Sequence, residues 1–248
     1  MLIDARSTDA PASYEADICI VGAGAVGLAM AAEFAGTQTR ILLIDTGGEE
    51  DDPDLIALNE MECVGLVPRR TPDISRHRRL GGTTNRWGGW NRPFSAEVTA
   101  QWPIGSGEIA RYVERTEALL ELRHADYDDI TQWAQVPDQH FVSYGPGILA
   151  KVRQVRALRM WPALREKLQK APNITILTNA SVVDADFTDD HEALTTVHAA
   201  TLTGRRLQIR AGRHVLACGG LETPLLLLNI DRAHGGEGAV YVLLKRKR

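Results

Sequence analysis

DICIVGAGAVG, the sequence of residues 17–27, has the pattern of a buried strand, a tight glycine turn and the start of a helix. Gly22 suits the sharp turn, Gly24 lets the backbone approach a phosphate, and Gly27 lets the helix pack closely on the strand. The free N–H groups and partial positive charge of a helix N-terminus favour an anion at such a turn. The segment therefore predicts a pyrophosphate site in an α/β fold.

Asp45 extends this pattern, because it follows a second apolar run, Ile41–Ile44, about 20 residues beyond the glycine turn. A carboxylate at this position accepts hydrogen bonds from ribose hydroxyls, and its charge disfavours a bound 2′-phosphate. A lone G-x-G-x-x-G motif is a weak signal that also fits an ordinary glycine turn. Here the strand, the helix and the acid agree, so the N-terminal region predicts dinucleotide binding.

The composition is that of a globular protein, with 248 residues, 44% of them hydrophobic, and a net charge of −4. This charge gives no reason to expect nucleic acid or an anionic membrane as a partner. No apolar run is long enough to span a bilayer, and residues 1–13 lack the apolar region of a signal peptide. The three cysteines and seven histidines do not have the spacing of a metal site. We expect a cytoplasmic protein without a metal.

The order of the expected elements narrows the fold class. Residues 1–14 resemble a disordered leader, and residues 15–46 predict a β-α-β unit. Further runs predict a helix at Glu108–Leu122 and strands at Ile174–Leu177, Ala193–Leu202, Arg206–Arg210 and His214–Ala217. A plain NAD dehydrogenase would more often continue with regular strand–helix alternation. The order therefore predicts an α/β fold with a Rossmann-like domain and a β-meander.

Three segments carry a resemblance to a known family. They are DICIVGAGAVGLAMAAEFAG…ILLIDTGG at 17–48, RLGGTTNRWGGWNRPF at 79–94 with WPI at 102–104, and HVLACGGLETPLLLL at 214–228. As a set, and in this order, they resemble the N-terminal, FAD-binding half of the glucose–methanol–choline (GMC) oxidoreductases. Within that family, GGTTNRWGG is most similar to the pyranose-oxidase-like branch.

The resemblance implies an FAD site and gives each matching position a role. The pyrophosphate and adenosine ribose would be held by Gly22, Gly24, Gly27 and Asp45. The loop that passes the flavin and pyrophosphate would consist of Gly81, Gly82, Thr83 and Asn85. Backbone contacts to adenine and to the ribityl–phosphate region would come from Val182, Val183, Gly219 and Gly220.

The resemblance also implies what to expect of activity. Some relatives attach the flavin covalently to a histidine, but the nearest equivalent position here is Arg86, so we expect non-covalent FAD. The implied domain spans residues 15–234, with an irregular insert at about 95–160, and residues 235–248 form a tail that does not resemble the family.

The implied reaction is oxidation of a CH–OH group of an alcohol, sugar or glycoside by hydride transfer to flavin N5. The family's catalytic histidine and its partner lie in a substrate domain without a counterpart here. We therefore assign no catalytic residue and expect a fragment of such an enzyme. The alternatives are a non-catalytic flavin-binding remnant, one half of a split enzyme and, less consistent with the later glycine motifs, an NAD-dependent dehydrogenase.

Other polar residues have an ordinary interpretation beside a functional one. Arg76 and Arg78 are expected on a solvated face, whereas Arg79 adjoins the glycine pair and its guanidinium suits a phosphate. Cys218 is expected to be a small buried residue rather than a redox group. His234 has no recognisable partner in the sequence and is not assigned as a base.

Overall fold

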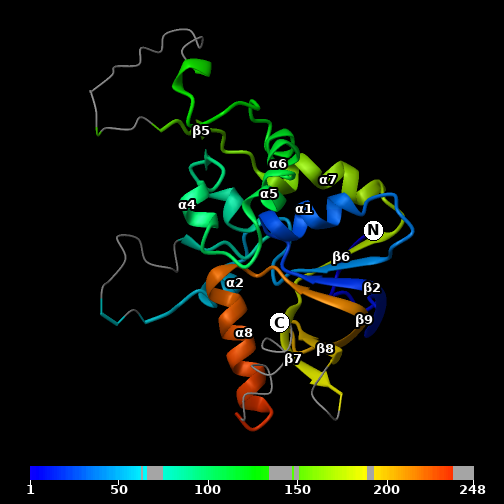
Figure 1. Ribbon diagram of the computed structural model, residues 1–248. Coiled ribbons are helices and arrows are strands. Elements are labelled where there is room, and N and C mark those ends of the chain that lie inside the picture. The colour runs from blue at the N-terminus through cyan, green and yellow to red at the C-terminus, as the bar shows by residue number, and fades with distance from the viewer. Residues whose placement is uncertain (63, 66–74, 134–146, 148–150, 189–192, 237–248) are drawn as a thin grey trace. The chain divides into compact units, whose positions relative to one another are not determined.

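The protein is represented by a computed structural model that describes residues 1–62, 64–65, 75–133, 147, 151–188 and 193–236 (Figure 1). The chain divides into a sheet unit, Met1–Arg86 with Arg159–Arg248, and an inserted unit, Trp87–Leu158. The inserted unit occupies the region for which the sequence suggests an insert at about 95–160. Of the expected tail at 235–248, only Gly235 and Gly236 belong to the described residues.

A seven-stranded, mostly parallel sheet forms the centre of the sheet unit. The strands in spatial order are β1 (Leu2–Asp4), β6 (Ile174–Thr178), β3 (Ile41–Ile44), β2 (Ser13–Val21), β9 (Arg206–Leu216), β8 (Leu194–Ala200) and β7 (Ser181–Phe187). Neighbours from β1 to β9 pair in parallel, whereas β8 pairs antiparallel with both β9 and β7. The fold is therefore mixed α/β, and strands β7 to β9 form a meander at one edge.

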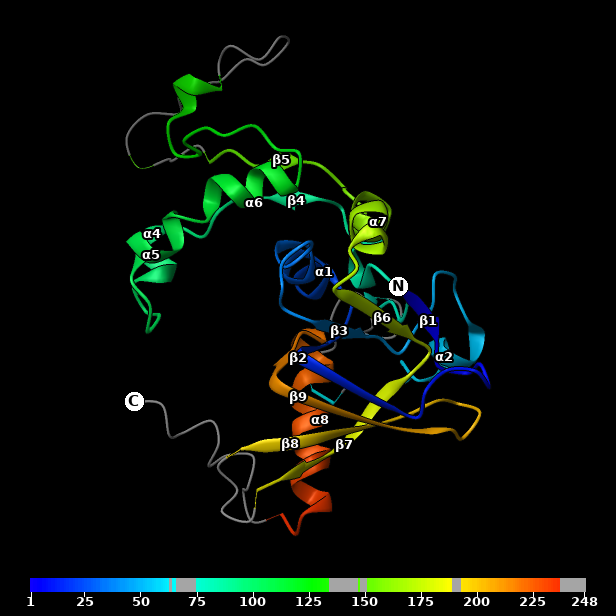
Figure 2. The same ribbon diagram turned by 90° about the vertical axis from the view of Figure 1, so that its right-hand side faces the viewer.

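The expected β-α-β unit is present as β2, α1 (Ala25–Glu33) and β3. The last four residues of β2 and all of β3 are buried, because both faces of these parallel strands are covered. Helix α1 contacts β2, β3 and helix α7 (Met160–Lys170). In Figure 2, α1 and α7 lie on one side of the sheet, and they bury Leu28 and Leu168 completely.

The other face of the sheet carries a second apolar layer. Its buried members include Cys19, Val21, Leu42, Ile44 and Leu207, which alternate along their strands with residues of the first face. Helix α8 (Gly219–Ala233) packs on β7, where Ile230 meets Ala185 and the partly buried Phe187, Leu226 and Leu227. Figure 2 shows α8 on the side of the sheet opposite α1.

The prediction of a disordered leader at residues 1–14 is wrong. Strand β1 pairs in parallel with β6, and the N-terminal amino group donates to the Ile174 carbonyl oxygen at 2.6 Å. Strand β2 also begins within this range, at Ser13. The two strands expected at Arg206–Arg210 and His214–Ala217 are one strand, β9, because pairing with β2 continues from Gln208 to Leu216.

The inserted unit is made of short elements. They are β4 (Trp90–Asn91), α4 (Ala96–Thr99), α5 (Ser106–Ala110), α6 (Val113–Leu119), the 3₁₀ turn η2 (Ile130–Gln132) and β5 (Gln154–Val155). Strands β4 and β5 form a two-stranded antiparallel pair. The helix expected at Glu108–Leu122 is divided into α5 and α6, which contact each other.

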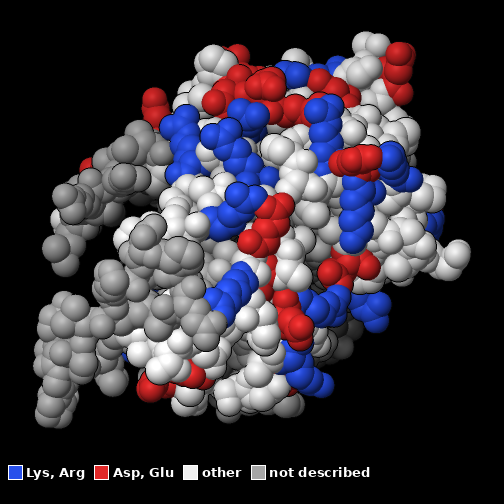
Figure 3. Space-filling view, turned by 90° about the horizontal axis from the view of Figure 1, so that it is seen from above, with Lys and Arg blue, Asp and Glu red and all other residues white. Residues whose placement is uncertain are grey.

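The surface charge and the length of the helices are relevant to whether nucleic acid or a membrane could be a partner. On the face shown in Figure 3, basic and acidic side chains lie interspersed rather than as a field of one sign. Among the described residues, no helix is both long and apolar enough to cross a membrane.

Candidate functional site

The parallel strands bring the glycine turns together at one edge of the sheet. Val21, Ile44 and Leu216 are aligned by the pairing of β2 with β3 and with β9, and Leu177 is aligned with Ile44. Each residue ends or nearly ends its strand, so the segments that follow them meet at the carboxyl edge. Ligands of open α/β sheets bind in the crevice outside this edge.

Gly22 and Gly27 make the first turn possible. Gly22 has a φ of +103°, and a Cβ there would lie 2.6 Å from the Ala217 carbonyl oxygen. A Cβ on Gly27 would lie 1.9 Å from the Gly22 carbonyl oxygen, which is far inside van der Waals contact. Both glycines therefore serve close backbone packing between β2, α1 and the end of β9.

Gly24 lies where the first and second glycine motifs meet. It is the N-cap of α1, and a Cβ added to it would have no heavy atom of the protein within 4 Å. The second motif docks beside it, because the Gly81 amide donates to the Ala23 carbonyl oxygen at 2.9 Å. A Cβ on Gly82 would approach the Gly24 Cα to 3.0 Å. The two loops thus form one backbone surface with open space at Gly24.

The side chains of the second motif stabilise their own loop. Asn85 ends the 3₁₀ turn η1 (Gly82–Asn85). Its Nδ2 donates to the carbonyl oxygen of Gly82, at the start of that turn, and to that of Leu80, which precedes the turn. Thr84 is buried, donates to the Gly81 carbonyl oxygen at 2.6 Å and accepts from the Met160 amide. Thr83 is exposed. The sequence singled out Thr83, whereas Thr84 connects this loop to α7.

Asp45 is a structural acceptor of the first turn. Its Oδ2 accepts from the Ala23 amide at 2.6 Å and its Oδ1 from the Gly47 amide at 2.8 Å. Burial raises the pKa of the Asp45 carboxyl, and the two amide donors oppose that rise. Each carboxylate oxygen has a second lone pair, so the group can still accept a hydrogen bond from a ligand.

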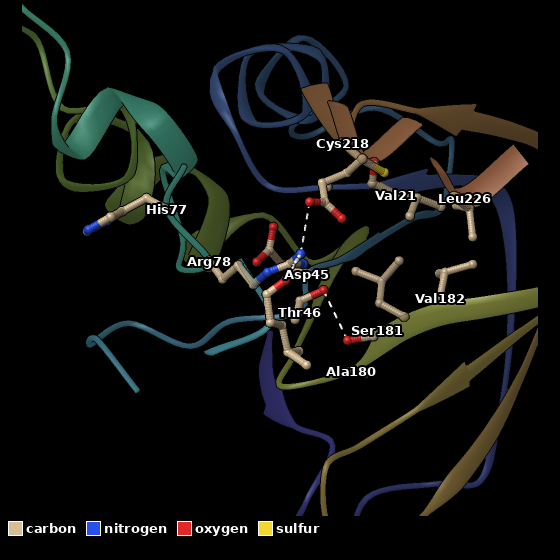
Figure 4. A pocket seen from close by; sticks show the side chains of 14 residues that line it. Val21, Asp45, Thr46, His77, Arg78, Ala180, Ser181, Val182, Cys218 and Leu226 are labelled. Carbon is tan, nitrogen blue, oxygen red and sulfur yellow. Dashed lines mark hydrogen bonds and ion pairs between the residues drawn. The ribbon is translucent and has the colours of Figure 1, made fainter. Parts of the chain in front are cut away.

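A cavity of about 300 Å³ opens beside Asp45. Figure 4 shows Asp45, Thr46 and Ser181 around it, with Val182 from β7 and Leu226 and Cys218 from the α8 side. The Ser181 hydroxyl donates to that of Thr46 at 3.2 Å. Val182 lines this space, whereas Val183 does not and is 39% exposed. Asp45 therefore lines the same cavity as Val182, the meander residue to which the resemblance assigns a contact with adenine.

The three arginines before the second glycine motif all contact acidic residues. The expectation that Arg76 and Arg78 lie on a solvated face is wrong, because their side chains are 13% and 15% exposed and both pair with Glu222 in the first turn of α8. Arg78 also donates to Asn59 Oδ1 at 2.8 Å, beside the cavity. Arg79, for which a phosphate contact is predicted, faces the acidic segment: its guanidinium donates to the Glu49 carbonyl oxygen and lies 3.5 Å from Asp51.

The third glycine motif begins α8. Gly219 has a φ of +87°, and neither it nor Gly220 has protein atoms within 4 Å of an added Cβ. Cys218, the N-cap of α8, lines the cavity, and burial raises the pKa of its thiol to about 11. A neutral thiol at pH 7 agrees with the expectation of an inert cysteine. The start of α8 thus leaves open space beside the glycine turn of β2.

Comparisons with solved structures agree with this fold. A structure of pyridoxine 4-oxidase from Mesorbium loti matches at a TM-score of 0.52 and 19% identity, over 86% of this chain and 51% of that one. A formate oxidase structure matches at a TM-score of 0.53 and 15% identity. A formate oxidase variant from Aspergillus oryzae, studied for its effect on FAD modification, matches at a TM-score of 0.53 and 17% identity. Each of these two matches covers 88% of this chain and 48% of the formate oxidase chain. No family model and no curated protein matches.

These neighbours are GMC oxidoreductases, so the resemblance inferred from the sequence is confirmed at the level of the fold. The chain spans about half the length of the structures that it matches. Sequence reasoning missed several lining residues of the cavity, namely Thr46, Arg78, Ser181, Glu222 and Leu226. Thr46, Glu222 and Leu226 lie in the quoted segments but have no assigned role there, Arg78 and Ser181 lie outside them, and only the fold brings the five together.

Proposed function

We propose that this chain binds FAD non-covalently at the carboxyl edge of its sheet, with a Rossmann-like mode of dinucleotide recognition. We further propose that it serves an oxidoreductase acting on the CH–OH group of an alcohol, sugar or glycoside. The observation that carries the proposal is the meeting of three glycine turns and Asp45 at this edge. The shared fold with flavoproteins supports the choice of cofactor.

The residues fit the cofactor chemically. The open space at Gly24, between Gly22 and Gly82, gives a pyrophosphate room to approach the backbone and the N-terminus of α1. Asp45 has spare lone pairs for ribose hydroxyls beside a cavity that Val182 also lines. When bound, the flavin would accept a hydride from the substrate. The protein's part is to bind and orient the cofactor.

A binding module without turnover is the second candidate. Its support is that the groups assigned at the carboxyl edge, namely the glycine turns and Asp45, have binding roles and none has a catalytic role. Dye reduction by the FAD-loaded chain, with a panel of sugars and alcohols, separates the two candidates. Substrate-saturable turnover would favour the oxidoreductase, and bound FAD without turnover would favour the binding module.

Non-covalent binding is testable by acid precipitation. Arg86, expected at the position where some relatives carry the flavin-linked histidine, donates from Nε to His77 Nε2, so an imidazole does lie close to that position. We expect acid to release all of the flavin into the supernatant, measured by its absorbance. Flavin that stays in the protein pellet would contradict non-covalent binding and would make His77 the first residue to test by substitution. A chain that takes up no flavin on reconstitution would refute the cofactor.

Asp45→Ala is expected to weaken FAD binding about 10- to 100-fold. The substitution removes a charge-assisted hydrogen bond to the ribose, typically worth about 1.5–3 kcal/mol. FAD titration, followed by quenching of flavin fluorescence, gives the affinity. Asp9→Ala, which removes an exposed carboxylate, is the control and should bind as the parent does. Equal affinities for the two variants would mean that the ribose lies elsewhere.

A further inference from the structure

A second cavity, of about 530 Å³, lies entirely within the inserted unit. Its wall is mostly apolar, and its lining includes the aromatic residues Trp90, Phe94, Tyr112 and Tyr127, with aliphatic side chains from α5 and α6. Trp90, Phe94 and Tyr112 are 68%, 64% and 54% exposed, so they mark its open side. The volume is within the range of small-molecule sites.

A buried carboxylate lies in this apolar wall. Glu117, on α6, lines the cavity, and its side chain is only 4% exposed. Its Oε2 contacts His124 Nδ1 at 2.5 Å, and this hydrogen bond raises the pKa of His124. Its Oε1 is buried and has no hydrogen-bond partner among the described residues. A buried acceptor without a donor is costly, and such a group calls for an explanation.

Two other polar side chains of the cavity wall, Arg92 and Tyr127, have partners of their own. Arg92 lines the same space but donates to the carbonyl oxygens of Tyr127 and Val152 and to Asp128. The Tyr127 hydroxyl accepts from Gln154 at 2.5 Å. Burial raises the pKa of Tyr127, and interaction of its O–H with the Glu117 carboxylate raises it further, but this O–H makes no hydrogen bond of normal geometry to Oε1. Glu117 Oε1 therefore remains an acceptor that a donor on a ligand, preferably a cation, would satisfy.

We propose that this cavity binds a primary ammonium compound with an aromatic or branched apolar body. The ammonium would donate to Glu117 Oε1, and the aromatic wall would cover the body and attract the cation through its ring faces. A quaternary ammonium has the charge but no N–H, so it would leave Oε1 unsatisfied. An anion would be repelled by Glu117. The proposal concerns the inserted unit alone and does not rest on FAD binding.

The test is calorimetric titration of the full chain with 2-phenylethylamine, which is an ammonium at pH 7. We expect it to bind at least about 10-fold more tightly than 2-phenylethanol, whose donor is neutral, or the N,N,N-trimethyl analogue, which has the charge but no N–H to donate. Glu117→Gln is expected to weaken the amine about 10- to 100-fold for the same reason. Glu114→Gln removes an exposed carboxylate from the same helix and should leave the affinity unchanged.

Two further arms keep the proposal falsifiable. If Glu117→Gln does not fold, as judged by circular dichroism, Trp90→Leu replaces it, because that side chain is 68% exposed and its loss should weaken binding without unfolding the unit. No binding of the amine at about 10 mM would overturn the proposal, and so would equal affinities for the amine and its trimethyl analogue. Unchanged affinity in Glu117→Gln would show that the carboxylate is not the recognition group.

Discussion

Replacement of Gly24 by valine should abolish FAD binding while leaving the fold intact. The open space at Gly24 is where we place the pyrophosphate, and a branched side chain there would exclude it. Loss of two charge-assisted hydrogen bonds to phosphate, about 1.5–3 kcal/mol each, corresponds to about 10²–10⁴-fold weaker binding. The backbone at Gly24 is extended, with φ −79° and ψ −164°, and valine adopts that conformation readily.

The measurement is FAD titration of the apo chain, with circular dichroism to check the fold. Gly107→Val is the matched control, because Gly107 lies in the inserted unit and an added Cβ there also meets no atom within 4 Å. That variant should bind FAD as the parent does. Full affinity in Gly24→Val would mean that the phosphates bind elsewhere, and the proposed role of the first glycine turn would be lost.

The sequence predicted the β-α-β unit because its signals are local. Buried parallel strands appear as continuous apolar runs such as Ile41–Ile44, and the spacing of Gly22, Gly24 and Gly27 indicates a turn in which positions 22 and 27 have no room for a side chain. The glycine contacts at Gly22 and Gly27 bear this out. The cofactor roles assigned to the same glycines remain predictions, since they concern a ligand rather than the chain.

Errors arose where the deciding partner is distant in the sequence. Leu2–Asp4 is too short and too mixed to predict a strand, and its order comes from pairing with β6, more than 170 residues away. Arg76 and Arg78 lie in a run of basic residues, which locally predicts a solvated face. Glu222, which pairs with both, is 146 residues from Arg76. No local pattern could reveal either contact.

Asp45 illustrates a subtler limit. Its position at the end of β3 predicted a ribose ligand, but not the two backbone amides that it accepts from in the chain itself. The carboxylate therefore ties the glycine turn to the segment after β3, whether or not it also binds the ribose. A variant of Asp45 must for that reason be checked for stability as well as for affinity.

Gly27→Ala should unfold or severely destabilise the chain, with or without cofactor. The new methyl carbon would lie 1.9 Å from the Gly22 carbonyl oxygen and 3.4 Å from Ile20 Cγ2. Gly22 cannot yield easily, because its amide donates to the Ile44 carbonyl oxygen at 2.8 Å and its φ is already +103°. Helix α1 would have to move off β2, and we expect a cost above about 4 kcal/mol, at the extreme of single substitutions.

Urea unfolding of the apo chain, followed by circular dichroism, measures this cost against Gly220→Ala. Gly220 also lies in the first turn of a helix, but an added Cβ meets no atom within 4 Å, so that variant should be neutral or gain about 0.4–1 kcal/mol. Similar unfolding midpoints for the two variants would contradict the packing role of Gly27. Gly27→Ala and Gly24→Val together separate two uses of glycine in one turn. The fold requires that Gly27 have no side chain, whereas the proposed ligand requires that Gly24 have none.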